Sequence, residues 1–350
     1  MDQYYTKPCN FYFGKKSINK IYEGKALPLH ANKLISFGCL EILNRKKSKI
    51  IGINEVKFLS KKLKYKIKQD LKNITKNKKF KNLKFSISPL LMGIINLTPD
   101  SFSDGGKYNK KKLSITRAKN LIKSGSTILD IGGESTRPGS DEVNEMVEWK
   151  RIEGFLKSRK KFNSLISLDT RKKNIMEKAF KYKIDIINDV SGMTYNTDTT
   201  NFLKKTKIPF IIHHMQGTPK TMQKNPKYKN VVLDIYDFFD KKINEIRAMG
   251  IKHNNIILDP GIGFGKNLKH NITILNQVSI FHSLGFPVML GISRKRFIKD
   301  LAGNNDSKER IGGTVSSSIW AMTQGIQILR IHDVNEVNQA IKIFKSLHFI

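Results

Sequence analysis

The stretch that decides the fold is LMGIINLTPDSFSDGG, residues 91–106. An apolar run typical of a buried strand ends at Asn96, and a polar, glycine-bounded loop follows. The same pattern returns in ILDIGGESTRPG, residues 128–139, and six weaker versions lie further along the chain. Apolar runs with polar ends predict parallel strands whose functional groups meet on one rim of a barrel.

The predicted strands alternate with longer amphipathic segments. Residues 231–249 and 337–347, for example, carry apolar side chains every three or four positions. This alternation predicts an α/β fold, the (β/α)8 TIM barrel, because eight units in about 260 residues have its usual size. A doubly wound open sheet is the alternative, although the count of eight favours closure. The predicted strands are residues 90–97, 126–132, 164–169, 184–190, 209–214, 255–259, 287–292 and 327–332.

The chain divides into two predicted parts, a small basic α+β appendage with a linker over residues 1–88 and the barrel over 89–350. In the appendage, residues 34–43 and 50–56 have the pattern of strands, and 58–74 carry a helical apolar stripe among many lysines. Such a helix can lie on a membrane or a nucleic acid. More commonly its apolar face packs on its own domain, and the role of this appendage stays open.

The formal net charge of +35 suggests a nucleic-acid partner, since basic proteins release counterions from phosphate backbones. The distribution of the charge favours another explanation. The excess extends over the whole chain, and Lys supplies 53 of the 64 basic residues although Arg binds phosphates and bases better. AT-rich codon usage accounts for this bias. We expect no nucleic-acid partner, and an anionic small-molecule substrate is compatible with the charge.

Cysteine usage and hydropathy predict a cytoplasmic protein without structural cross-links. Cys9 and Cys39 lack metal-ligand spacing, so neither a disulfide framework nor a structural zinc site is expected. Residues 1–30 lack the apolar core of a signal peptide. No later run reaches the about 18 apolar residues that cross a bilayer, so no membrane partner is expected.

Polar side chains stand at the end of every predicted strand. A single aspartate there is commonly a helix cap, but eight polar strand ends together predict a functional site. One set of side chains accepts and donates paired hydrogen bonds, which suits a flat heterocycle with several N–H and C=O groups. Its members are Asp169, Asn188, Asp259 and Lys295.

A second set suits an anion and consists of Arg137, Arg330 and His332. Its last two members end strand 8, and the loops after strands 7 and 8 of such barrels commonly bind phosphate. Asn96 offers a neutral oxygen to a Mg²⁺ ion that already carries phosphate oxygens and waters. The glycines of DPGIGFGK, residues 259–266, lack phosphate-loop spacing and predict a tight turn instead.

These motifs together resemble the dihydropteroate synthase family of pterin-binding barrels. The resemblance covers about residues 90–348, and its most specific motifs are residues 92–106 and 132–139. It implies an enzyme of folate biosynthesis that joins 6-hydroxymethyl-7,8-dihydropterin diphosphate to 4-aminobenzoate and releases diphosphate. It also implies Mg²⁺ at Asn96 and a homodimer through outer helices. Further motifs that carry the resemblance are residues 167–170, 188–192, 214–217, 259–266, 293–295 and 330–333.

The resemblance also implies roles for individual residues. The pterin would lie on Asp169, Asn188, Asp259 and Lys295, beside Met215 and Phe264, and the diphosphate on Thr136, Arg330 and His332. Gly291 would be a further substrate-binding residue. The aminobenzoate would lie among Phe102, Asp104, Arg137 and Pro138. The implied catalytic residues are Asp169, Asp104, Arg137 and Lys295, the two aspartates being the groups expected to stabilise positive charge or receive the amine proton.

One departure from the family pattern concerns Arg296, which stands where many members have a serine that helps to bind the aminobenzoate carboxylate. Its contact with the carboxylate therefore stays open. Two alternatives to a synthase are considered: a pterin-binding methyltransferase barrel, which needs no diphosphate site, and a basic nucleic-acid-binding or regulatory barrel without turnover.

Overall fold

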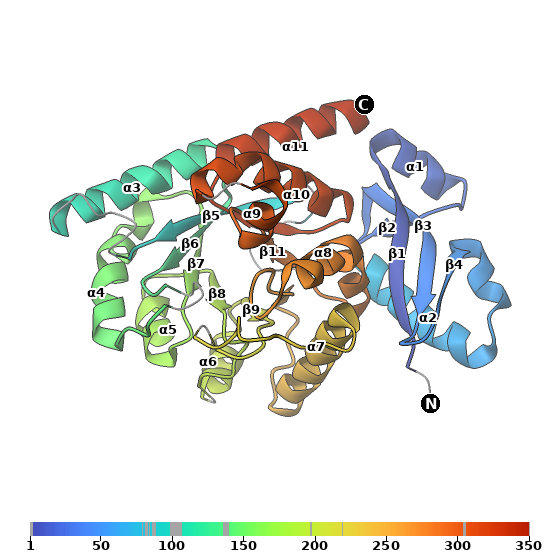
Figure 1. Cartoon of the computed structure of the whole chain (residues 1–350), viewed down its shortest axis with the longest axis horizontal. Coiled ribbons are helices and arrows are strands. Elements are labelled where there is room, and N and C mark those ends of the chain that lie inside the picture. The colour runs from blue at the N-terminus through green and yellow to red at the C-terminus, as the bar shows by residue number, and fades with distance from the viewer. Residues whose placement is uncertain are drawn as a thin grey trace.

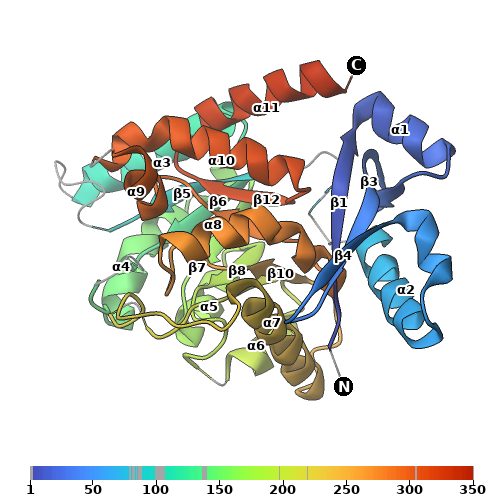
Figure 2. The same cartoon turned by 45° about the vertical axis from the view of Figure 1, so that its right-hand side comes forward.

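The computed structural model describes residues 3–78, 80, 83, 85, 89–98, 107–135, 140–196, 198–218, 220–303 and 306–349. They form a large barrel with a smaller antiparallel sheet docked at one end (Figure 1). The strands of the barrel begin on the side of the small sheet and point away from it (Figures 1 and 2). Among the described residues, no helix is both long and apolar enough to cross a membrane.

Eight parallel strands form the barrel, in the spatial order β10-β9-β8-β7-β6-β5-β12-β11. A parallel bridge between Leu258 and Val288 joins the two ends of this order, and the Leu258 amide donates to the Pro287 carbonyl at 2.9 Å. The sheet is therefore closed, which confirms the barrel and makes the open-sheet alternative wrong. The strands are β5 (Leu90–Asn96), β6 (Ile128–Gly132), β7 (Leu165–Asp169), β8 (Ile186–Asp189), β9 (Phe210–His213), β10 (Ile256–Asp259), β11 (Met289–Gly291) and β12 (Ile328–Ile331).

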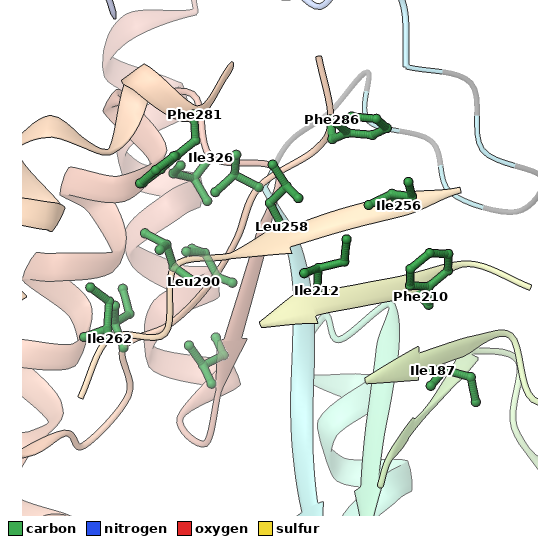
Figure 3. Packing of buried hydrophobic residues seen from close by; sticks show 14 of the residues in the cluster. Ile187, Phe210, Ile212, Ile256, Leu258, Ile262, Phe281, Phe286, Leu290 and Ile326 are labelled. Carbon is green, nitrogen blue, oxygen red and sulfur yellow. The ribbon is translucent and has the colours of Figure 1, made fainter. Parts of the chain in front are cut away.

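Helices surround the barrel and bury one face of each strand. On β9, Phe210 and Ile212 pack outward in the large core (Figure 3), while Ile211 belongs to a separate cluster inside the barrel. This alternation follows from the two-residue period of a strand. The helices are α3 (Lys107–Lys123), α4 (Glu145–Leu156), α5 (Lys173–Phe180), α6 (Thr199–Thr206), α7 (Val231–Ala248), α8 (Leu268–Gln277), α9 (Arg296–Ala302), α10 (Ile311–Thr323) and α11 (Val334–His348), with 3₁₀ turns η4 (Arg159–Lys161), η5 (Val278–Leu284) and η6 (Ser307–Arg310).

Three described residues of the segment between the appendage and β5 pack at the base of the barrel. Its described apolar side chains, Phe80, Leu83 and Phe85, pack on inward-facing residues near the starts of the strands, and the Phe80 and Phe85 rings meet edge to face at 5.3 Å. This apolar plug occupies the base of the barrel, and the polar strand ends lie at the opposite end. The strand residues in this cluster are Met92, Ile128, Ile186, Ile211, Ile257, Met289 and Ile328.

The appendage is an antiparallel sheet in the order β1-β3-β2, with β4 also pairing β3. The predicted strand 34–43 is present as part of β3, and the helix predicted over 58–74 is α2, which buries Ile67 and Ile74 in the appendage core. That helix therefore packs on its own domain. Its elements are β1 (Tyr5–Phe13), α1 (Gly14–Tyr22), β2 (Leu27–Leu29), β3 (Asn32–Leu43), β4 (Ser48–Gly52), η1 (Ile53–Phe58) and α2 (Lys61–Thr75).

Two expectations for the appendage were incomplete. The strand predicted over residues 50–56 ends at Gly52, because the chain turns there into η1, where Glu55 accepts a hydrogen bond from the Gly52 amide at 2.5 Å. Strand β1 and helix α1 were not predicted. The strand interrupts its apolar pattern with Pro8 and Asn10, and is held by pairing with the distant β3.

Polar contacts hold the appendage to the base of the barrel. The Arg45 guanidinium forms ion pairs of 2.7 Å with both Asp234 and Asp237 of α7. The Ser279 hydroxyl of η5 donates to the Pro8 carbonyl at 2.9 Å, and Lys78 donates to the Gly285 carbonyl at 2.6 Å. The appendage therefore contacts the barrel through η5 and Gly285, and through the first turns of α7.

Candidate active site

A buried charge network lies at the carboxyl ends of the strands. Arg330 of β12 donates from Nε to Asp130 of β6 at 2.6 Å and from Nη2 to Asp169 of β7 at 2.7 Å. Asn188 of β8 donates to Asp130 at 3.2 Å. Four strands thus present one guanidinium, two carboxylates and one amide to a shared volume, and the predicted residues Asp169, Asn188 and Arg330 are brought together.

Asp130 is the member of this network that the sequence interpretation missed. It lies in the middle of β6, is fully buried, and is flanked by Leu129 and Ile131 of the hydrophobic core. A carboxylate in the centre of an apolar strand is itself a signal, because burying an unpaired charge is costly. Asp130 was not predicted because only the polar residues at strand ends were considered.

Mutual charge pairing sets the electrostatics of the network. Burial raises the pKa of Asp169 to about 8, an effect that Arg330 opposes and the nearby Asp130 charge reinforces. Burial disfavours the charge of Arg330, yet Asp130 and Asp169 together keep its pKa above the usual range. Arg330 therefore stays charged and is the counterion of the two carboxyl groups.

Several buried acceptors in this volume have no partner among the described residues. They are Oδ1 of Asp169, Oδ1 of Asn188 and the hydroxyl oxygen of Ser167. Buried polar atoms are nearly always hydrogen-bonded in folded proteins. Side-by-side carboxylate and amide oxygens therefore fit a ligand that presents adjacent N–H groups.

A second cluster faces the volume from β10 and the segment after β11. Asp259 ends β10, and its carboxylate accepts from the Gly261 amide at 2.8 Å. Lys295 donates to the Ile262 carbonyl and lies 4.2 Å from the centroid of the Phe264 ring. Burial lowers the pKa of Lys295 to about 7, although the Asp259 carboxylate opposes this, and burial raises the pKa of Asp259.

The loop after β10 is shaped by glycines, as predicted. Gly261 has φ +69°, and a Cβ there would lie 2.0 Å from the His214 carbonyl oxygen. Lys266 is buried, donates to the Phe264 carbonyl at 2.8 Å, and lies 3.0 Å from Nδ1 of His214. Lys266 therefore holds the loop in place.

His213 supports the same loop from β9. Its Nδ1 lies 3.0 Å from the Val190 carbonyl oxygen, and its ring meets Phe264 edge to face at 4.5 Å. Burial lowers the pKa of His213 well below its usual value, so the ring is neutral at pH 7. Met215, predicted beside the pterin, is half-buried two residues after the end of β9.

The residues predicted for the anion and the metal lie around the neighbouring strands. His332 directly follows β12, and its amide donates to the Ser293 hydroxyl at 3.1 Å. Gly291 of β11 is in register with Arg330, and Asn96 is the half-buried last residue of β5. The predicted residues Phe102, Asp104, Thr136, Arg137 and Pro138 lie outside the described residues.

Glu134 anchors the start of the loop that follows β6. Its carboxylate accepts from Arg171 at 3.2 Å, pairs with Lys172 at 3.2 Å and accepts from the Val143 amide at 3.0 Å. Both flanks of residues 136–139 are thereby tied to the barrel.

Arg296 is largely exposed and lies 3.6 Å from the Asp300 carboxylate.

The described residues contain no group of three His, Cys, Asp or Glu side chains that could hold a metal ion by themselves. Asn96 supplies a single amide oxygen. Mg²⁺ is commonly held by one or two protein ligands together with phosphate oxygens and waters. One neutral oxygen at the mouth therefore fits an ion that arrives with a phosphorylated substrate.

Comparison with known proteins identifies the family. Residues 92–332 match the model of the pterin binding enzyme family. The dihydropteroate synthase of Neisseria meningitidis serogroup B is 43% identical over 264 residues, which cover 74% of this chain and 93% of the relative. The Escherichia coli K12 enzyme of the same name is 38% identical over 259 residues, covering 74% and 91%.

Solved structures agree with these relatives. The Yersinia pestis dihydropteroate synthase, solved with a sulfonamide drug complex, has a TM-score of 0.71 at 38% identity and covers 76% of this chain and 96% of its own. The Xanthomonas albilineans enzyme with 4-aminobenzoic acid has a TM-score of 0.70 at 32% identity, covering 76% and 95%. The chain therefore belongs to the dihydropteroate synthase family of pterin-binding enzymes, transferases of folate biosynthesis.

Proposed function

We propose that the barrel mouth binds the pterin ring of 6-hydroxymethyl-7,8-dihydropterin diphosphate through Asp169, Asn188, Asp259 and Lys295. The observation that carries this proposal is the pair of unpartnered buried acceptors, Asp169 Oδ1 and Asn188 Oδ1. A pterin edge has adjacent N–H groups that fit them. Lys295 stands on the other side of the volume and can donate to a ring carbonyl when it is protonated.

The anion site adjoins the pterin site through Arg330. Its Nε and Nη2 donate to Asp130 and Asp169, and no hydrogen bond of Nη1 is recorded with the described residues, so this nitrogen can donate to an anion. His332 follows directly on the same strand. We propose that both residues, with Thr136, bind the diphosphate. Asn96 would hold Mg²⁺, which when bound stabilises the charge that the leaving diphosphate develops.

The chemistry that we propose is departure of diphosphate and attack of the arylamine on the pterin methylene carbon. Positive charge on the pterin is stabilised by the ionised form of Asp169, which the Arg330 guanidinium favours against burial and which also can receive the amine proton. No side-chain nucleophile is needed. The roles of Phe102, Asp104, Arg137 and Pro138 around 4-aminobenzoate rest on the family resemblance alone.

The relatives support the choice of substrates. The Xanthomonas albilineans enzyme has been solved with 4-aminobenzoic acid and also with 7,8-dihydropteroate. The methyltransferase alternative does not account for Arg330 and His332 at the end of β12. The homodimer and the cytoplasmic location stay predictions, and size-exclusion chromatography with light scattering tests the first.

Diphosphate release tests the proposal. Purified full-length protein is mixed with pterin diphosphate, 4-aminobenzoate and Mg²⁺, and we expect one diphosphate for each dihydropteroate formed. Release that does not depend on 4-aminobenzoate would contradict the proposed transfer. Absence of turnover combined with salt-dependent duplex binding would instead favour the nucleic-acid alternative.

A further inference from the structure

The two cysteines of the sequence, Cys9 and Cys39, lie directly opposite each other in the appendage sheet. They belong to the antiparallel strands β1 and β3, and two residues along the ladder, on the same face, Lys7 and Glu41 form an ion pair. Both cysteines are free and half-buried. Their sequence separation gave no indication of this pairing, which arises only when β1 joins β3.

The pairing of Cys9 with Cys39 is compatible with a disulfide bond. Opposite residues of an antiparallel ladder have Cα atoms about 4.5 or 5.5 Å apart, and their side chains stand on the same face. Disulfides span Cα distances of about 4.4 to 6.8 Å. The Asn10 side-chain amide donates to the Cys39 sulfur at 3.9 Å.

We propose that Cys9 and Cys39 are a reversible oxidation site that forms a disulfide between β1 and β3. With glutathione disulfide as oxidant, one thiolate attacks it and releases a glutathione thiol, and the second thiolate then attacks the mixed disulfide and releases another. The two protein thiols lose two protons and two electrons. The glutathione disulfide is reduced to two glutathione molecules, so the exchange is balanced.

The position of the pair determines the consequence of oxidation. The carbonyl of Pro8, next to Cys9, accepts from Ser279 at the base of the barrel, whereas Asp169 and Arg330 lie at the opposite end. The bond therefore fixes the strand that contacts the barrel and leaves the catalytic volume unchanged. Burial raises the pKa of the Cys9 thiol to about 11, which disfavours its thiolate at pH 7.

The test equilibrates the full-length protein in glutathione buffers of increasing oxidised fraction. We expect free thiols to fall from two to none, a Cys9–Cys39 linked peptide in non-reducing mass mapping, and a rise in Tm of roughly 5 °C that dithiothreitol reverses. The value of kcat/KM should not change. Because reduced wild-type protein is the reference, the test does not depend on a variant folding.

The matched controls are the single variants Cys9→Ser and Cys39→Ser. Each retains one thiol, so neither should gain the rise in Tm under oxidising buffer. Glutathione adducts on both cysteines without a link, linked dimers between two chains, or two free thiols in a large excess of glutathione disulfide would each overturn the proposal.

Discussion

At the scale of single residues, Arg330 determines how two carboxylates can share a buried volume. Asp130 and Asp169 come from neighbouring strands, and without the guanidinium between them their charges would repel in a medium of low dielectric. Asp130 also accepts from Asn188 and so connects the arginine to the proposed pterin site. We regard Asp130 as a positioning residue, since it acts through Arg330 and Asn188.

A double-mutant cycle tests this role of Asp130. Asp130→Ala leaves Arg330 with one counterion fewer and should lower the free energy of unfolding by about 3 kcal/mol, because removing one partner leaves a buried charge uncompensated. In Asp130→Ala/Arg330→Ala the cost should be clearly less than the sum of the single variants. Urea unfolding measures all four proteins, and strictly additive costs would show that the two side chains do not interact.

The pH dependence of activity tests Lys295. Its pKa of about 7 in the free enzyme means that the ammonium is lost as the pH rises through 7, so kcat/KM should fall on that side if the charged form donates to the pterin. In Lys295→Arg this limb should vanish, since a guanidinium stays charged. An identical limb in the variant would assign the titration to another group.

The titration of Lys295 also makes the free energy of unfolding depend on pH. The pKa of Lys295 is lower in the folded than in the unfolded protein. Between pH 7 and about 10.4 its side chain is therefore protonated in the unfolded chain and largely neutral in the folded one. The contribution of Lys295 to the free energy of unfolding therefore rises with pH across that window. It is lost again as the pH falls toward 7.

At the scale of elements, the loop from Asp259 to Lys266 positions the second half of the site. Gly261 permits the close approach to the His214 carbonyl, and the turn brings Phe264 under Lys295. The loop thus places Phe264 and Lys295 on one side of the proposed pterin pocket.

Replacing Gly261 by alanine tests the loop. Because the new Cβ would meet backbone at 2.0 Å, Gly261→Ala should cost more than about 2 kcal/mol and raise KM for the pterin substrate. The control is Gly303→Ala, where φ is +77° but no atom lies within 4 Å, so only the backbone cost of about 1–2 kcal/mol applies. Equal effects of the two variants would show that the contact does not matter.

At the scale of the whole molecule, the protein has an apolar base and a polar mouth. Phe80, Leu83 and Phe85 come from the segment that joins the appendage to β5, so the linker is part of the barrel core. The appendage itself is clamped to α7 by Arg45. The contact of Pro8 with Ser279 lies at the base of the barrel, at the other end from Asp169 and Arg330.

Phe85→Ala tests the plug. Loss of a buried phenylalanine should lower the free energy of unfolding by about 3–4 kcal/mol, while KM for both substrates stays unchanged. Phe58→Ala is the matched control, since Phe58 is 77% exposed and should change stability by less than about 0.5 kcal/mol. A large rise in KM for Phe85→Ala would show that the base and the mouth are coupled.

The sequence predicted what is encoded locally. All eight barrel strands were found because each is an apolar run with a polar end, and three members of the charge network were found because they stand near those ends. Asp130 was missed because it lies within a strand. The apolar plug was missed because Phe80, Leu83 and Phe85 are scattered among lysines with no period, and their partners come from all eight barrel strands.

The central claim is that Asp169 at the barrel mouth takes part in pterin transfer, and kcat/KM of Asp169→Asn in the diphosphate-release assay tests it most directly. We expect a loss of at least about 100-fold, since the amide can neither carry the negative charge nor receive the amine proton. The control Asp300→Asn, an exposed carboxylate paired with Arg296, should keep the wild-type rate. A folded Asp169→Asn enzyme with wild-type kcat/KM would contradict the account.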